Sequence, residues 1–412
     1  MNDLILAFEV LLAIYKDGAF ASIELNKKVN GASNQAIVTR MVYGVLQKDV
    51  ELEYYIGKIT AKRPSKTIVV LIKLGLYCLI YINSIPKYAL VNNLVTICEK
   101  YGKRQLKGFV NATLKNFDRE KILLPEDELE RLSVEASVPL WIVKKYVKQY
   151  GFQATDSFVR SELFTKEHIR ANLRKITLEE LESKLGKENV EYERSRAGGL
   201  FVRNCAVVKN LCEKGFATIQ SMTSMLAAQA MEVKDGEKVL DICSAPGGKA
   251  VYMSELADVK ITACDKYEHR IELIKSYVAR TSAKGIEAIF NDALVYNEKF
   301  ENAFDKTLCD APCSGLGVAG KKPDIYLNSS ESKIKELTEV QYGILTNAAK
   351  YTKRRLVYST CTLLKEENGD IVDRFIKENP KWKLVSQKQY LPDGKGCDGF
   401  YIAVLEKKTA DE

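Results

Sequence analysis

Two short stretches in the second half of the chain carry side chains that suit chemistry better than core packing. Residues 304–315 read FDKTLCDAPCSG, and residues 356–362 read LVYSTCT. Each begins as an apolar strand and ends in a polar loop with a cysteine, Cys313 in the first and Cys361 in the second. Ligands of open α/β sheets bind beyond the carboxyl ends of the strands. We therefore expect Asp310, Cys313 and Cys361 to face one crevice.

A glycine-containing loop follows the predicted strand 237–242 and precedes a predicted helix. The loop consists of Cys243, Ser244, Ala245, Pro246, Gly247, Gly248 and Lys249. Two glycines allow a ligand to approach the backbone, and a helix start offers unpaired N–H groups. The loop is neither GxGxxG nor a Walker-type GK[ST], so we favour S-adenosylmethionine over a phosphate ligand. For Lys249 alone, a helix-start lysine without a ligand is an equally good interpretation.

Acidic residues end the next three predicted strands. Asp265 comes 17 residues after Gly248, where a carboxylate accepts hydrogen bonds from ribose hydroxyls in dinucleotide folds. Asp292 ends the third strand, where we expect it to meet the edge of a base, and Asp310 ends the fourth. Each of four successive predicted strands is thus followed by a residue that could bind a ligand. The turns alone would not require such a residue after every strand.

The elements that must position these residues alternate between strand and helix from residue 235 onward. Apolar runs predict strands at 237–242, 259–264, 286–290, 304–309 and 354–358, with helices such as 268–281 and 333–350 between them. An antiparallel hairpin, 381–386 with 399–406, closes the chain. This alternation predicts an α/β fold with a mostly parallel, doubly wound sheet.

The first 150 residues have a different pattern. Apolar residues recur there at three- and four-residue spacing, and Pro64, Pro86 and Pro125 separate the periodic segments. This pattern predicts a compact helical bundle. Between bundle and sheet, strand-like and helical pieces mix over residues 164–220, which predicts a small α+β connector.

The composition favours some classes of partner and argues against others. The net charge is +8, and residues 1–150 hold 22 lysines and arginines against 15 acidic residues, so about +1 is left for the remainder. A basic balance favours a polyanionic partner, although charge alone fits a lysine-rich solvated surface better. Ten scattered cysteines without a secretory signal predict reduced thiols in a cytoplasmic protein. Two histidines and no CxxC pair argue against a metal site, and the apolar stretch 68–82 is too short to span a membrane.

The motifs DICSAPGGK, DAPCSGLGV, KKPDIY and YSTCT resemble those of RNA cytosine-5 methyltransferases that share a NOL1/NOP2/Sun domain. The order of parts is similar to that of bacterial family members that act on 16S ribosomal RNA and begin with a region like the antitermination factor NusB. The resemblance implies three parts: an RNA-binding NusB-like domain over 1–130, a connector over 131–220, and a Rossmann-like methyltransferase domain over 221–412.

The resemblance also implies roles for the candidate residues. The loop 243–249, Asp265, Asp292 and Asp310 would hold S-adenosylmethionine. Cys361 would be the nucleophile that adds to the cytosine ring, and Cys313 would help to release the product. From its position next to Pro312, we also expect Asp310 to hydrogen-bond the exocyclic amine and ring nitrogen of the base. The attacking cysteine stays open at this point, because DNA cytosine-5 enzymes use the cysteine of a Pro-Cys motif, which here is Cys313.

The implied function is methylation of ring carbon 5 of a cytosine in 16S ribosomal RNA, either free or in early small-subunit assembly, by a monomeric enzyme without a membrane partner. Two alternatives are the same reaction on transfer RNA and a non-catalytic RNA-binding or antitermination-like protein. The retained Asp310, Cys313 and Cys361 argue against the second alternative.

Overall fold

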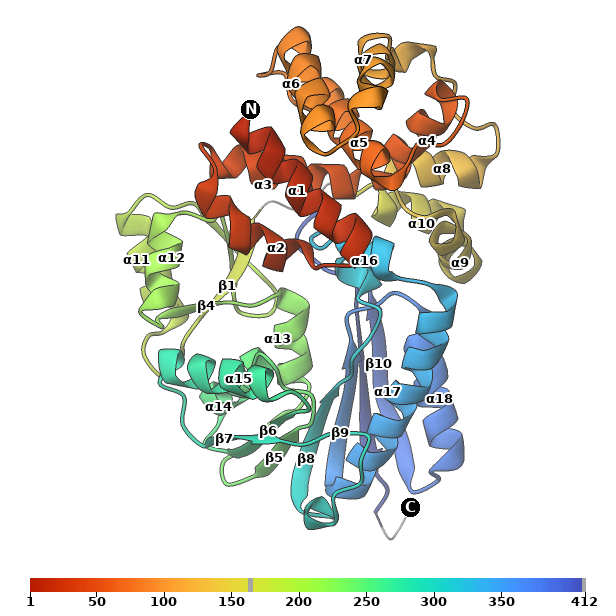
Figure 1. Cartoon of the computed structure of the whole chain (residues 1–412). Helices are drawn as coiled ribbons and strands as arrows, with labels where there is room; N and C mark the ends of the chain where they lie inside the picture. Colours follow the sequence, from red (N-terminus) through yellow and green to blue (C-terminus); the bar gives the residue numbers. More distant parts are fainter. Residues whose placement is uncertain (162–165, 410–412) are drawn as a thin grey trace. The chain divides into compact units, whose positions relative to one another are not determined.

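The computed structural model describes residues 1–161 and 166–409 (Figure 1). The chain forms two compact units, Met1–Arg160 with Ala319–Ser329 and Ser161–Val318 with Ser330–Glu412. The predicted domain limits at residues 130 and 220 stay predictions. Residues 162–165 of the predicted connector and 410–412 of the predicted methyltransferase domain lie outside the described residues.

The first unit is helical, as predicted. Its main helices are α1 (Asn2–Asp17), α2 (Ala21–Lys28), α3 (Gln35–Gln47), α4 (Asp49–Ile59), α5 (Lys66–Tyr81), α6 (Lys87–Lys100), α7 (Lys107–Lys115), α8 (Glu128–Ala136), α9 (Leu140–Tyr150) and α10 (Phe152–Val159). The apolar stretch 68–82 forms most of α5, which is buried from Thr67 to Cys78. A side chain at Gly44 of α3 would meet the Tyr77 ring at 2.0 Å, so glycine lets α3 approach α5. The described parts of the chain contain no helix that is both long and apolar enough to cross a bilayer.

One piece of the first unit comes from far along the chain. The KKPDIY motif lies in the segment Ala319–Ser329, which contains α16 (Asp324–Asn328). The Asp324 carboxylate is buried and accepts a hydrogen bond from the backbone N–H of Ala21, at the start of α2, at 3.3 Å. Leu327 packs against the apolar core of the helices. The motif therefore folds with the helical unit, which the sequence alone did not indicate.

The second unit contains two sheets. The small antiparallel sheet has the order β2-β3-β1-β4, with β1 (Glu167–Ala171), β2 (Tyr192–Arg194), β3 (Leu200–Val202) and β4 (Ala217–Ile219). Its helices are α11 (Leu178–Lys187) and α12 (Ala206–Glu213). This sheet forms the predicted α+β connector, and its three-residue strands β2 and β4 were missed because they are too short to show alternation.

The large sheet has the order β10-β11-β9-β8-β5-β6-β7. Its strands are β5 (Lys238–Asp241), β6 (Lys260–Asp265), β7 (Ile286–Phe290), β8 (Phe304–Asp310), β9 (Thr352–Thr360), β10 (Trp382–Tyr390) and β11 (Phe400–Lys407). The pairs from β7 to β9 are parallel, and β10 and β11 add an antiparallel edge. The predicted mostly parallel sheet with a closing hairpin is confirmed.

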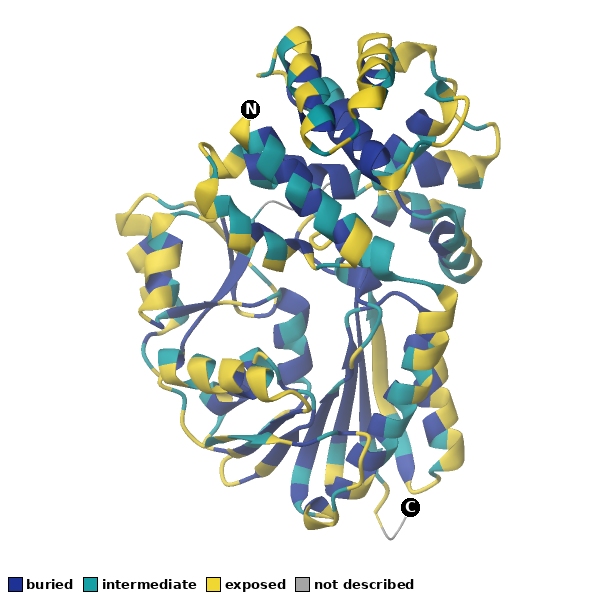
Figure 2. Cartoon of the chain, in the orientation of Figure 1, coloured by how far each residue is buried: buried dark blue, intermediate teal, exposed yellow. Residues whose placement is uncertain are grey.

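Alternate residues of the central strands face two different helix layers. Val239 packs in a core with α13 (Met222–Gln229), α14 (Gly248–Leu256) and α15 (Glu268–Thr281). Its neighbour Leu240 packs in a core with α17 (Glu331–Tyr351) and α18 (Gly369–Glu378). Burial on both faces explains why the strands read as nearly continuous apolar runs, and Figure 2 shows the central strands mostly in the colour of buried residues.

A buried ion pair joins the small antiparallel sheet to helix α14, which follows β5 of the large sheet. Arg170 Nη1 of β1 lies 2.5 Å from Glu255 Oε2 of α14, and both side chains are 1% exposed. The Arg170 guanidinium also donates to the Gln220 side chain and lies over the Tyr252 ring. Breaking such a pair leaves an uncompensated buried charge, so the connector and the region around α14 are held as one body.

Candidate active site

The pairing of β8 with β9 brings the two reactive loops to one edge of the sheet. The strands are parallel, and Asp310 lies opposite Ser359 in their register. The Ser359 hydroxyl donates a hydrogen bond to Asp310 Oδ1 at 2.6 Å, and the Ala311 N–H donates to the Ser359 carbonyl oxygen at 2.9 Å. The loops that carry Cys313 and Cys361 therefore leave the sheet at the same level.

The two predicted cysteines are in contact. Their Sγ atoms lie 3.3 Å apart, and the backbone N–H of Cys361 donates to the Cys313 sulfur at 3.3 Å. Both residues are partly exposed. The hydrogen bond with Cys361, burial, and the charges of Cys361 and Glu367 raise the pKa of the Cys313 thiol well above its ordinary value. The contact therefore disfavours ionisation of both thiols at the same time.

A lysine–aspartate pair adjoins the thiols. The Lys249 ammonium lies 2.6 Å from Asp310 Oδ2, and the two side chains are 15% and 26% exposed. Burial acts to lower the Lys249 pKa, but Asp310, Asp241 and Cys361 together outweigh burial and raise it. Lys249 is thus the ion-pair partner of Asp310.

The predicted glycine loop makes a tight turn between β5 and α14. The Ser244 N–H donates to the Cys264 carbonyl oxygen and the Gly247 N–H to the Ser244 carbonyl oxygen, both at 2.7 Å. Gly247 has φ of 102°, a conformation that favours glycine. A side chain at Gly247 would also meet Ile274 at 3.3 Å. The first N–H groups of α14 are left open to a ligand.

Among the described residues, several buried polar atoms around this loop have no hydrogen-bond partner at ordinary distance. They are both carboxylate oxygens of Asp241, the Ser244 hydroxyl and the Asn291 Nδ2. Burial raises the pKa of Asp241 to about 7, although the neighbouring Ser244 hydroxyl and the Lys249 charge act to lower it. Buried polar groups are normally satisfied, so these atoms point to a ligand with both donors and acceptors. The amino, carboxylate, ribose and adenine groups of S-adenosylmethionine fit this set.

The remaining predicted carboxylates lie at the next strand ends. Asp265 ends β6, is buried, and pairs with Arg270 through Oδ2 and Nη1 at 3.1 Å. Arg270 also donates to the Ala245 carbonyl oxygen at 3.3 Å, so it links Asp265 to the glycine loop. Asp292 follows β7 and accepts a hydrogen bond from the Leu294 N–H at 3.0 Å.

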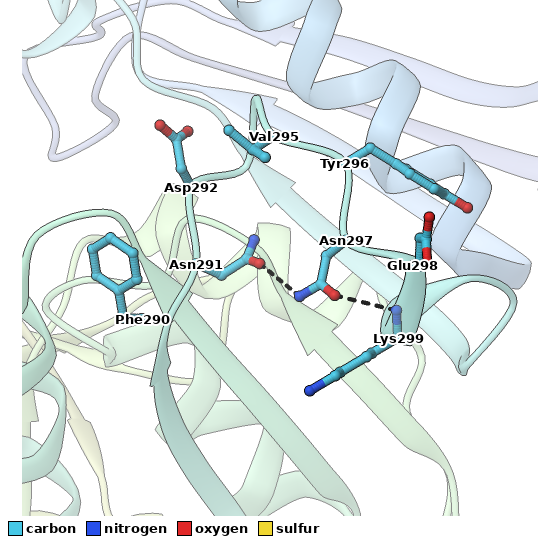
Figure 3. Close-up of a pocket in the computed structure, with 8 residues that line it drawn as sticks. All are labelled: Phe290, Asn291, Asp292, Val295, Tyr296, Asn297, Glu298 and Lys299. Carbon is cyan, nitrogen blue, oxygen red and sulfur yellow. Dashed lines mark hydrogen bonds between the residues drawn. The ribbon is translucent and has the colours of Figure 1, made fainter.

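Asp292 lines a pocket of about 460 Å³ beyond the end of β7 (Figure 3). The residues that line it are Phe290, Asn291, Asp292, Val295, Tyr296, Asn297, Glu298 and Lys299. In Figure 3 the Asn297 side chain donates to Asn291 Oδ1, at 3.0 Å. This hydrogen bond fixes the orientation of the Asn291 amide, whose Nδ2 is buried and has no hydrogen-bond partner among the described residues.

Sequence reasoning missed several residues that shape the site. Asp241 stood inside the DICSAPGGK motif and received no role, although it is a carboxylate at a predicted strand end. Arg270 and Asn291 are ordinary surface-type residues in sequence, and only the fold brings them to the glycine loop and the pocket. Glu367 lies six residues after Cys361, and its contacts with both cysteine loops are visible only in three dimensions.

Comparison with known proteins shows the family of the chain. Residues 228–406 match the family described as 16S rRNA methyltransferase RsmB/F, and residues 1–119 match the NusB family. The chain is 33% identical to the probable ribosomal RNA small subunit methyltransferase B of Bacillus subtilis (strain 168), and the match covers 98% of each chain. This chain belongs to the RsmB/F methyltransferase family. S-adenosylmethionine is accordingly its cofactor, and the resemblance found in the motifs is confirmed.

Other relatives extend the same similarity. The ribosomal RNA small subunit methyltransferase B of Photorhabdus laumondii is 28% identical, with 91% of each chain covered. The crystal structure of PH0851 has a TM-score of 0.84 at 24% identity and covers 99% of each chain. A structure of NSun6 from Pyrococcus horikoshii with SFG has a TM-score of 0.58 at 22% identity, covering 64% of this chain and 97% of that chain. These two structures support the fold, a Rossmann-like domain preceded in PH0851 by matching N-terminal parts.

The raised pKa of Asp241 predicts a pH-dependent stability. The pKa rises from 3.8 to about 7 on folding, so the folded state holds this proton more tightly than the unfolded state. The contribution of Asp241 to stability is full below about pH 4 and is lost as the pH rises through 7. Relative to the parent, Asp241→Asn should gain on the order of 2–4 kcal/mol in unfolding free energy between pH 4.5 and pH 8.

Urea unfolding of the ligand-free protein at the two pH values measures this difference. Asp258→Asn, at an exposed aspartate in the same unit, is the matched control and should show no such change. A difference between Asp241→Asn and the parent that does not vary with pH would contradict the assignment.

Proposed function

We propose that this rRNA methyltransferase transfers a methyl group to ring carbon 5 of a cytosine in 16S ribosomal RNA, with Cys361 as the covalent nucleophile. The observation that carries the proposal is the contact of the Cys361 and Cys313 sulfurs at 3.3 Å, beside the Asp310–Lys249 pair. Family membership supports ribosomal RNA as the substrate.

The reaction requires a nucleophile on the protein. Ring carbon 5 of cytosine is a poor nucleophile, and addition of a thiolate at carbon 6 makes carbon 5 enamine-like, so covalent catalysis divides one hard step into two easier ones. S-adenosylmethionine supplies the methyl group when it is bound. The proton on carbon 5 must then leave, and the bond between sulfur and carbon 6 must break to restore the aromatic ring and the free thiolate.

The environments of the two cysteines support Cys361 as the attacking group. The thiolate is the reactive form of cysteine, and a positive neighbour favours it. The Lys249 ammonium interacts with Cys361 and favours its thiolate, whereas contact with Cys361 and burial raise the pKa of Cys313. A protonated Cys313 at 3.3 Å is placed to donate a hydrogen bond to the Cys361 thiolate. After Cys361 has bonded to carbon 6, Cys313 would lose its proton to solvent, and the resulting thiolate could accept the carbon 5 proton and so regenerate the Cys313 thiol.

Asp310 is proposed to orient the base. Ser359 and Lys249 each hold one of its oxygens, so the carboxylate is fixed before the substrate arrives. An oriented carboxylate can accept hydrogen bonds from the exocyclic amine and from a protonated ring nitrogen, which stabilises charge as the adduct forms. The target cytosine must leave its stack to reach this site.

The remaining predicted residues are proposed to hold the cofactor. The loop Cys243, Ser244, Ala245, Pro246, Gly247, Gly248 and Lys249 would bind it together with Asp265, Asp292 and Asp310. To this set we add Asp241 and Asn291, which carry buried polar atoms without a hydrogen-bond partner at ordinary distance among the described residues. Asp241 would accept hydrogen bonds from a cationic group, and Asn291 would donate to an acceptor in its pocket.

A mechanism-based trap tests the nucleophile. RNA that carries 5-fluorocytosine at the target position should form a stable adduct with the parent protein, because fluorine cannot leave carbon 5 as a proton does. Cys361→Ala should lose the adduct, and Cys313→Ala should keep it, as seen by denaturing gel electrophoresis. Cys205→Ala, at a partly exposed cysteine of the connector, is the control and should behave as the parent. Loss of the adduct in Cys313→Ala with retention in Cys361→Ala would reverse the assignment.

Sequencing of bisulfite-treated RNA tests the substrate. Ribosomal and transfer RNA from cells with and without the gene should differ at a cytosine in 16S ribosomal RNA, which resists conversion only when the gene is present. Complementation with Cys361→Ala should not restore the protected cytosine. Protection that appears in transfer RNA alone would favour the transfer RNA reaction, and no protected cytosine in either RNA would favour a non-catalytic role.

A further inference from the structure

We infer that Glu367 is a positioning residue that locks the two cysteine loops against each other and so sets the distance between the Cys313 and Cys361 sulfurs. The inference rests on the proposed function, in which both cysteines act on one base. Glu367 ends the short helix η6 (Lys365–Glu367) between β9 and α18, and its side chain is fully buried.

The Glu367 carboxylate binds the residue that follows each cysteine. Oε1 accepts a hydrogen bond from the Ser314 N–H at 2.8 Å. Oε2 accepts from the Ser314 hydroxyl at 2.6 Å and from the Thr362 hydroxyl at 2.9 Å. Ser314 directly follows Cys313, and Thr362 directly follows Cys361. One carboxylate therefore holds both loops one residue beyond their reactive sulfurs.

Gln341 of α17 also binds the loop that carries Cys313. Its Nε2 donates to Glu367 Oε1 and to the Pro312 carbonyl oxygen, both at 3.0 Å. Cys313 is thus fixed through the residue before it and the residue after it. The Gln341 side chain is buried, so this amide has little freedom to follow a displaced loop.

Hydrogen bonds also fix the backbone of Glu367 and the turn around it. The Tyr358 hydroxyl donates to the Glu367 carbonyl oxygen at 2.7 Å, and the Asn368 side chain donates to the Thr362 carbonyl oxygen at 3.1 Å. The position of the carboxylate is therefore determined by β9 and by the turn that follows it.

The chemical type of this residue fits a positioning role. Its four side-chain hydrogen bonds come from uncharged donors: a backbone N–H, two hydroxyls and an amide. A buried carboxylate is costly unless hydrogen bonds satisfy it, and bonds to an ionised acceptor are short and strong. A strong acceptor for four donors on three separate segments fixes their relative positions more tightly than neutral contacts do. Displacement of a reacting group by about 1 Å can lower a rate by roughly a hundredfold.

A cross-linking assay reports the distance between the sulfurs without RNA or cofactor. Hydrogen peroxide oxidises one thiol to a sulfenic acid and is reduced, releasing one water. The second thiol then attacks that sulfur, which forms the disulfide and releases a second water. Peptide mass spectrometry gives the rate of the Cys313–Cys361 cross-link. Dividing this rate by the rate of iodoacetamide labelling of the same cysteines removes differences in thiol reactivity.

Glu367→Gln keeps the shape of the side chain and removes its charge. It should lower the normalised cross-linking rate at least tenfold and lower kcat for RNA methylation by roughly a hundredfold, with KM for S-adenosylmethionine within about twofold of the parent. Glu237→Gln is the matched control, because Glu237 is a buried glutamate before β5, at the opposite end of the sheet's strands, paired with Lys306. It should leave the normalised cross-linking rate unchanged.

Circular dichroism first establishes that each variant is folded. If Glu367→Gln does not fold, Thr362→Val replaces it, because it removes one of the four donors and should lower the cross-linking rate by a smaller factor. An unchanged cross-linking rate in the folded variant overturns the inference, even if kcat falls, and so does a parent protein that forms no cross-link. A lowered cross-linking rate in a protein whose parent makes no 5-methylcytosine leaves the positioning role standing and refutes the proposed reaction instead.

Discussion

The site depends on the parallel pairing of β8 with β9. This pairing sets Asp310 opposite Ser359, and every later contact follows from it: the Ser359 hydroxyl reaches Asp310, the loops turn out of the sheet together, and the two thiols meet. Because side chains alternate along a strand, a shift of one residue in this register would turn Asp310 or Ser359 to the other face. Burial of both faces of the sheet under helices makes such a shift costly.

A second constraint is electrostatic. Asp241, Asp265 and Asp310 lie at the ends of adjacent strands. Among the described residues, Lys249 forms an ion pair with Asp310, and Arg270 forms one with Asp265. Asp310 and Asp265 form ion pairs, whereas Asp241 is buried, forms no ion pair among the described residues, and has a raised pKa. The ionised Asp241 carboxylate is therefore unfavourable in the protein alone, and the proposed binding of a cationic cofactor beside it would stabilise it.

Much of this could be predicted from the sequence, and the limits have physical reasons. Strands 286–290 and 304–309 and helix 268–281 were predicted almost to the residue because long apolar runs and clear periodicity mark them. The three-residue strands β2 and β4 carry no such pattern. The candidate carboxylates and cysteines were found because strand ends in α/β sheets gather ligands. Glu367, Gln341 and Arg270 were not found, since their roles arise from contacts between segments far apart in the sequence. The same holds for the KKPDIY motif, which folds with the helical unit.

The central claim is that the Cys361 sulfur bonds to the cytosine ring while Cys313 stays free. Mass spectrometry of the unaltered protein tests it most directly, after trapping on RNA with 5-fluorocytosine in the presence of S-adenosylmethionine, followed by nuclease and protease digestion. The account predicts that the modified nucleotide is attached to the peptide containing Cys361, with the Cys313 peptide unmodified. Attachment to the Cys313 peptide, or a trapped complex with neither peptide modified, would contradict it.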